Sequence, residues 1–152
     1  AGAMPTVNPT VVAANDYDHD GDLDLAVVSP PDRLQVWRND TAAGTHWLKV
    51  VLSQTESPPD GVGAVVQVWA GQQVQERQLQ LTPGFGAHTA PVLHFGLGNV
   101  ASVDQVRVWW PSGKVSLVGN TDADQEIVLS ESQAFGNQAA AATDAEIGRA
   151  HV

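Results

Sequence analysis

Residues 16–24 read Asp16-Tyr17-Asp18-His19-Asp20-Gly21-Asp22-Leu23-Asp24, so five carboxylates alternate with other side chains over nine positions. Carboxylates held this close together repel one another unless a cation lies among them. Calcium takes about six to eight oxygen ligands, and calcium-binding loops supply them from alternate positions, with a glycine where the chain turns sharply. Gly21 stands at that glycine position. The spacing therefore predicts a calcium site.

The predicted ligands follow from counting along this loop. They are the side chains of Asp16, Asp18, Asp20 and Asp24 and the backbone carbonyl of Asp22. The alternative is a solvated acidic turn without an ion, or an aspartate-rich linker. We favour calcium because an oxygen donor stands at every required position and the glycine is present.

The residues on either side distinguish this loop from an EF-hand. An EF-hand has a helix on each side and a bidentate glutamate near its end, where this chain has Val27. The flanking runs 11–14 and 25–28 are short, apolar and partly β-branched, which is typical of strands. We therefore predict a β-hairpin closed by the acidic loop, followed by a turn at Pro30-Pro31-Asp32 and a third strand over 34–38.

Residues 14–27 resemble the calcium-binding core of an FG-GAP repeat, also called a VCBS repeat, and residues 32–40 resemble the strand that ends such repeats. The resemblance implies that residues 5–41 form one blade of a β-propeller. A propeller needs several blades, and three strands alone leave open edges. We expect this blade to pack against the rest of the chain, a second copy or further blades, and its open edges could support self-association.

From Thr45 onward the pattern changes to a series of strands separated by short turns. Strands are predicted at 46–54, 64–70, 74–81, 91–95, 104–110, 115–118 and 126–129, with Gly96-Leu97-Gly98 as a break. So many strands at short intervals indicate an antiparallel β-sandwich over residues 45–130. The chain is thus predicted to be all-β. Residues 131–152 are rich in Ala, Gln and Gly, and we expect a flexible tail with a short helix near 143–149.

Four motifs in residues 45–130 resemble, in order and spacing, the successive signatures of the ASPIC/UnbV domain; they are His46-Trp47-Leu48-Lys49-Val50, Asp60-Gly61-Val62-Gly63-Ala64, His94-Phe95-Gly96-Leu97-Gly98 and Val108-Trp109-Trp110-Pro111-Ser112-Gly113-Lys114. In the cartilage acidic protein group this domain follows the last FG-GAP blade. The resemblance implies a transthyretin-like or Ig-like sandwich that packs on a propeller, with the loop at 83–90 directed towards the propeller axis.

Charge and composition exclude several classes of partner. The formal net charge of −10 argues against nucleic acid and anionic membranes, both of which need a basic surface. The chain has no cysteine, which excludes disulfides and thiol catalysis, and no apolar run reaches the roughly 20 residues that span a bilayer.

The compartment is suggested by the predicted ion. Calcium sites of extracellular modules are weak, with Kd on the order of 0.1–1 mM, and they fill only where calcium is abundant. We therefore expect a secreted or cell-surface protein. The opening Ala1-Gly2-Ala3-Met4 looks like a cloning remnant, so we expect the chain to be a piece of a longer protein.

Signals for catalysis are weak. His88 and His94 could act as bases, but the chain contains no Gly-x-Ser-x-Gly and no His-Glu-x-x-His motif. The glycines in 96–101 copy part of a dinucleotide fingerprint, but the next predicted strand follows too soon for the helix that this fingerprint requires. We predict that His94 is a packed or hydrogen-bonding structural residue and that the chain is not an enzyme.

Two further groups of residues have competing interpretations. Asp122, Asp124 and Glu126 could hold a second cation, although a turn entering a strand is the favoured interpretation. Five tryptophans could line a carbohydrate platform, although we expect most of them in the core or in interfaces; they are Trp37, Trp47, Trp69, Trp109 and Trp110. Trp109 and Trp110 are adjacent on a strand, so one of them should be exposed.

Together these features predict a non-enzymatic, calcium-stabilised extracellular module for adhesion or recognition of a protein or a glycan. The alternative is a carbohydrate-binding module attached to a larger secreted enzyme.

Overall fold

The computed structural model describes residues 11–30, 33–40, 44–81 and 91–136, and their regular structure is β apart from two short 3-10 turns. The chain is therefore all-β over this part, as predicted. No helix among these residues is long and apolar enough to cross a membrane. The loop at 83–90 with His88, the helix expected near 143–149 and residues 1–4 lie outside the described residues.

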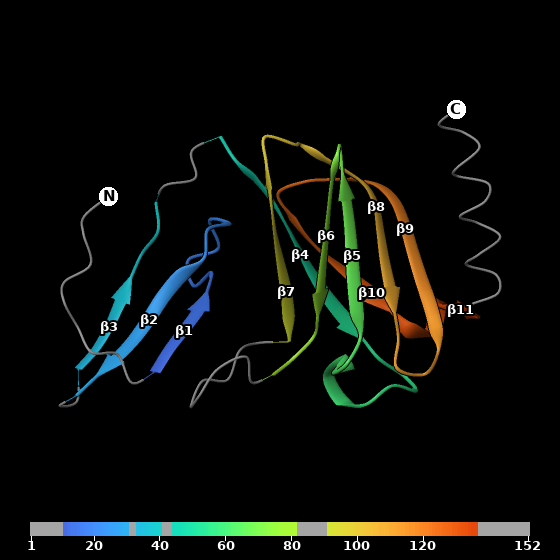
Figure 1. The fold of residues 1–152 in the computed structure, drawn as a ribbon, viewed down its shortest axis with the longest axis horizontal. Helices are drawn as coiled ribbons and strands as arrows, with labels where there is room; N and C mark the ends of the chain where they lie inside the picture. The colour runs from blue at the N-terminus through green and yellow to red at the C-terminus, as the bar shows by residue number, and fades with distance from the viewer. Residues whose placement is uncertain (1–10, 31–32, 41–43, 82–90, 137–152) are drawn as a thin grey trace.

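The first three strands form an antiparallel sheet in the order β1-β2-β3; they are β1 (Val11–Asn15), β2 (Asp24–Ser29) and β3 (Arg33–Trp37). Asn15 lies opposite Asp24, so the acidic loop closes the β1–β2 hairpin. The predicted hairpin and third strand are confirmed. Figure 1 shows this sheet on the left, beside the other two sheets.

One face of the β1–β3 sheet exposes apolar side chains. Val28 lies opposite Leu34, and Ala26 lies opposite Val36, so these residues share a face. Leu34 and Val36 are 67% and 57% exposed. Both outer strands, β1 and β3, also have an open edge within the described sheet.

A second sheet has the order β10-β4-β7, with β4 (His46–Ser53), β7 (Val92–Gly98) and β10 (Gln125–Ser130). A third has the order β11-β9-β8-β5-β6, with β5 (Val65–Ala70), β6 (Gln73–Gln78), β8 (Ser102–Trp109), β9 (Lys114–Asp122) and β11 (Phe135–Gly136). The 3-10 turns are η1 (Pro59–Gly61) and η2 (Glu131–Gln133). Figure 1 shows these strands to the right of the β1–β3 sheet.

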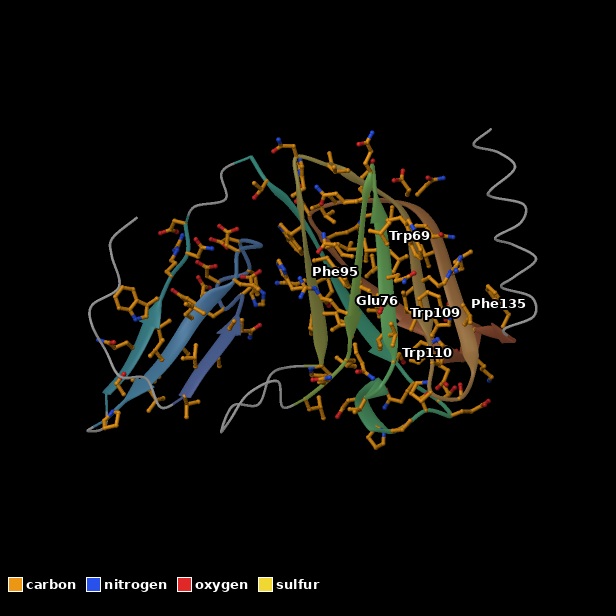
Figure 2. The ribbon with its side chains drawn as sticks, in the orientation of Figure 1. Trp69, Glu76, Phe95, Trp109, Trp110 and Phe135 are labelled. Atoms are coloured by element: carbon orange, nitrogen blue, oxygen red, sulfur yellow. The ribbon has the colours of Figure 1, made fainter. Side chains whose placement is uncertain are left out.

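Both of these sheets contribute to one hydrophobic core. Alternate residues of β4 and β7 face alternate residues of β5 and β8 in a single cluster, because side chains of a strand alternate between its two faces. Phe95 and Leu97 of β7 are completely buried, and each contributes roughly 1.5–3 kcal/mol by leaving water. Phe95 is labelled in Figure 2.

The β4–β10 pair departs from the predicted antiparallel arrangement because it is parallel. Asp124, between β9 and β10, is the physical reason. Its backbone N–H donates to the Trp47 carbonyl at 2.7 Å, and its carboxylate accepts from Trp47 N–H at 3.2 Å and lies 2.7 Å from His46 Nδ1. These contacts hold the first residues of β4 and β10 together, so both strands run in the same direction. For Asp124, the interpretation as a turn residue entering a strand is confirmed.

Several predicted boundaries are wrong, and the largest extension of a strand is β9, which was predicted at 115–118 and spans Lys114–Asp122. Gly96-Leu97-Gly98 does not break β7, because the alternation of Leu93, Phe95 and Leu97 into the core continues through it. That burial exceeds the cost of about 0.5–1 kcal/mol for a glycine in a strand. The tail was predicted to begin at residue 131, but η2 and β11 extend the ordered structure to residue 136, and β11 pairs with β9.

Candidate metal centre

The acidic loop has a tight backbone conformation that depends on Gly21. The φ angle of Gly21 is +98°, in the left-handed region that favours glycine. A Cβ atom at Gly21 would lie 1.9 Å from Nε1 of Trp47, so the indole ring occupies the space that any side chain would need. Gly21 therefore serves the turn, as predicted, and also the contact with β4.

Three of the four carboxylates predicted as ligands come together. Asp16, Asp18 and Asp24 each offer a carboxylate oxygen, and these oxygens all lie within 4.8 Å of one another. Asp16 and Asp24 are 3% and 2% exposed. Such a group of buried carboxylates is costly without a neutralising cation.

The hydrogen bonds of this group differ between its members. Asp24 accepts from the backbone N–H of Asn39 at 2.7 Å and from that of Tyr17 at 3.2 Å. Asp16 Oδ2 accepts from the N–H of Gly21 at 3.0 Å. Asp16 Oδ1 is buried and has no hydrogen-bond partner among the described residues. A buried carboxylate oxygen without a donor is rare, and a cation would satisfy it.

Asp20 and Asp22 are placed differently from the other three. Asp20 accepts from the backbone N–H of Asp22 at 2.9 Å, and its carboxylate lies 3.9 Å from Arg38. The carboxylates of Asp20 and Asp22 do not belong to the close group of oxygens. Their predicted roles, including the Asp22 carbonyl, stay predictions.

Two cationic side chains reach the loop. Arg38 lies 3.0 Å from Asp18, and Lys49 Nζ lies 2.5 Å from Asp16 Oδ2. Burial raises the pKa of Asp16, but the hydrogen bonds from Lys49 and Gly21 outweigh this effect and hold the pKa below its usual value. Against five carboxylates these pairs supply two positive charges, so a divalent cation would still be attracted to the loop.

The outer face of the β4–β7 pair forms a platform beneath the loop. This platform consists of Trp47, Lys49 and His94. His94 lies opposite Lys49 and stacks on Trp47 with ring centroids 6.1 Å apart. His94 Nε2 lies 2.8 Å from the Gly21 carbonyl oxygen, which can only accept, so Nε2 carries the proton. Burial lowers the pKa of His94. His94 is therefore packed and hydrogen-bonded, as predicted, and its assignment as a structural residue instead of a base stays a prediction.

Sequence reasoning did not connect this platform to the metal loop. All three residues lie in the quoted motifs at 46–50 and 94–98, so the motifs were visible. The contact of these residues with the loop was not visible in the sequence, because His94 and Gly21 are more than 70 positions apart. A lysine that alternates with buried residues on a strand, as Lys49 does between Leu48 and Val50, was the available signal.

The other candidate residues are engaged in structural contacts. Trp110 is 3% exposed and donates from Nε1 to Ser116 Oγ at 2.9 Å. Trp69 and Trp109 are half-buried, and the Arg107 guanidinium lies 5.2 Å and 5.3 Å from their ring centroids. Figure 2 shows both tryptophans on the five-stranded sheet. The prediction that Trp109 or Trp110 is exposed is therefore met only in part, by Trp109.

A cavity of about 440 Å³ adjoins the acidic loop between the β1–β3 sheet and the β6 and β7 strands. Its lining includes Asp16, Lys49, Arg77 and His94.

The oxygen donors fit a calcium ion. The group consists of carboxylates alone, and hard oxygen ligands without sulfur or imidazole suit calcium or magnesium better than zinc. Asp16 Oδ1 is buried and has no hydrogen-bond partner among the described residues, so it is an acceptor that an ion could use. Asp16, Asp18 and Asp24 would hold the ion, and its charge would neutralise the loop.

Comparisons with known proteins bear mainly on the second part of the chain. Residues 54–135 match the family model described as ASPIC and UnbV. The chain is also similar to cartilage acidic protein 1 of Mus musculus, with 32% identity over 116 residues, which are 74% of this chain and 17% of that protein. The chain therefore spans about a sixth of the length of this relative, and the acidic loop lies outside the family match. By the match over residues 54–135, the chain belongs to the ASPIC and UnbV family.

Proposed function

We propose that residues 16–24 bind one calcium ion and that the chain is a non-enzymatic, calcium-stabilised recognition module. The observation that carries this proposal is the close group of Asp16, Asp18 and Asp24 carboxylates, together with a buried Asp16 Oδ1 that has no hydrogen-bond partner among the described residues. The ion has a structural role here: it neutralises the loop that closes the β1–β2 hairpin and thereby supports the contact of this hairpin with β4 and β7.

The architecture that we propose for this module has two parts. The β1–β3 sheet is interpreted as a single FG-GAP-type blade, supported by its antiparallel order and by apolar side chains such as Leu34 and Val36 that a neighbouring sheet could cover. The other two sheets are interpreted as a transthyretin-like β-sandwich, supported by their shared core. A protein or a glycan is the proposed ligand.

We place this module in a secreted or cell-surface protein. The support is the weak affinity typical of extracellular calcium modules, which fill at about 0.1–1 mM calcium. The chain's acidic balance, with a net charge of −10, agrees with a partner other than nucleic acid.

Replacing Asp18 by asparagine is expected to weaken calcium binding at least about tenfold, because the close group loses one of its three charges. Asp18 is suitable because its side chain is 19% exposed and its loss should leave the fold intact. The measurement is a calorimetric calcium titration of the whole chain. Asp104→Asn, at an exposed position of β8, is the matched control and should bind calcium as the parent chain does, because the asparagine oxygen can still accept from the Gly71 N–H. Equal affinities for both variants would show that the ligands are wrongly assigned.

A second candidate function is carbohydrate binding, as in a module attached to a secreted enzyme. The observation in its favour is the row of Trp69, Arg107 and Trp109 on one face of the β5–β8 pair. Aromatic rings with a polar neighbour can stack on sugar rings. Because Arg107 already lies against both rings, we rank this function second.

A further inference from the structure

Lys49 is a buried cation placed at the junction of the acidic loop and the β4–β7 platform. It is 8% exposed, and its Nζ lies 2.5 Å from Asp16 Oδ2 and 5.0 Å from the Trp47 ring centroid. A buried ammonium is costly unless it is paired. The burial of the Lys49 ammonium therefore depends on its pairing with the Asp16 carboxylate. The burial of that carboxylate depends on Lys49 in the same way.

The two oxygens of Asp16 have separate environments. Oδ2 accepts from Lys49 Nζ and from the Gly21 N–H, whereas Oδ1 has no partner among the described residues. The carboxylate of Asp16 also lies in the close group with those of Asp18 and Asp24, so an ion held by these three residues would meet the carboxylate that Lys49 already pairs with. Lys49 and a metal ion would thus share one carboxylate.

We propose that Lys49 sets the calcium affinity of the loop by acting as a built-in counter-cation. Without metal, its ammonium neutralises Asp16 and keeps the hairpin on the platform. With metal bound, the same charge repels the ion and holds its affinity down. This inference rests on the proposed function, because it concerns the same site.

The direction of the effect follows from what remains when the charge of Lys49 is removed. The Gly21 N–H still donates to Asp16 Oδ2, and Asp16 is still enclosed, so the ligand keeps its orientation. The repulsion between two cations, by contrast, disappears. Lys49→Gln keeps a donor near Asp16 and removes the charge, and Lys49→Met keeps the aliphatic stem and removes both.

The test is a calorimetric calcium titration of the whole chain and of these two variants, together with thermal unfolding in EGTA. We expect Kd for calcium to fall at least about tenfold in both variants, while their metal-free melting temperature falls. Lys114→Gln and Lys114→Met are matched controls, because Lys114 forms a partly exposed pair with Glu56 at 2.6 Å. Both controls should keep the parent affinity within about twofold.

Each result decides the proposal. If the parent chain binds calcium and Lys49→Gln binds it equally or more weakly, the role of Lys49 is refuted and the calcium site stands. If neither the parent chain nor the variants bind calcium, the proposed function fails, and this inference fails with it. A Lys49→Met chain that folds only with calcium supports the proposal, since the ion then replaces the missing cation. The same chain unfolded at saturating calcium would contradict it.

Discussion

Replacing Glu131 by alanine is expected to lower the free energy of unfolding by about 3–5 kcal/mol. Glu131 is completely buried, and its carboxylate accepts five hydrogen bonds, from the backbone N–H groups of Thr55, Glu56 and Ser57 and from the hydroxyls of Ser57 and Ser112, at 2.5 to 2.9 Å. Alanine leaves all of these donors without their acceptor. Urea unfolding of the two proteins measures the difference.

The same residue is expected to make stability depend on pH. Burial raises the pKa of Glu131, but the hydrogen bonds from Ser112, Ser57 and Thr55 outweigh it and hold the pKa well below its usual 4.5. A carboxyl whose pKa is lowered by folding adds stability that is fully present above its usual value and is lost as the pH falls below it.

Glu131→Gln is the control for this pH dependence, because it keeps the shape and an acceptor oxygen but cannot titrate. The difference in unfolding free energy between the parent chain and Glu131→Gln should be largest near pH 7 and should shrink as the pH falls below about 4.5. A difference that stays constant down to about pH 3 would mean that folding does not lower the pKa of Glu131.

Gly21→Ala is the second change with a large expected effect, a loss of about 3 kcal/mol. An alanine Cβ at φ +98° is strained and would overlap Trp47, so the indole has to leave the loop. Displacement of Trp47 should also shift tryptophan emission to longer wavelength, since its ring would meet water. Chemical unfolding monitored by fluorescence measures both effects.

The matched control for Gly21 is Gly44. Its φ of +89° is similar, but a Cβ there would meet no atom of the described residues within 4 Å. Gly44→Ala should therefore cost only the backbone strain, about 1–2 kcal/mol, and leave the emission unchanged. Equal losses of unfolding free energy for the two variants would show that the contact between Trp47 and the loop adds nothing to stability.

Local patterns predicted much of the fold. Alternation of apolar residues located β5 and β8, and the short apolar runs around the acidic loop located β1 and β2, because each such pattern is fixed by neighbours in sequence. The strand predicted over residues 74–81 corresponds to β6, which is at the edge of its sheet.

The features that were missed depend on contacts between distant residues. The parallel pairing of β4 and β10 follows from the hydrogen bond between Trp47 and Asp124. The regular structure in residues 131–136 follows from the hydrogen bonds that Glu131 accepts from the backbone of residues 55–57. Neither partner is marked by composition, and residues 131–136 begin a segment whose Ala, Gln and Gly content suggested a tail. For the candidate metal site, spacing named the candidate ligands, but it could not show that Asp16 pairs with Lys49.

The central claim, that residues 16–24 enclose a calcium ion, is tested most directly by the melting temperature of the whole chain in calcium and in EGTA. An ion that binds only the folded chain adds about 2.7 kcal/mol of stability at a concentration of about 100 times Kd. For a chain of this size that corresponds to a rise of roughly 5–10 °C. A melting temperature that is the same in saturating calcium and in EGTA would contradict the account.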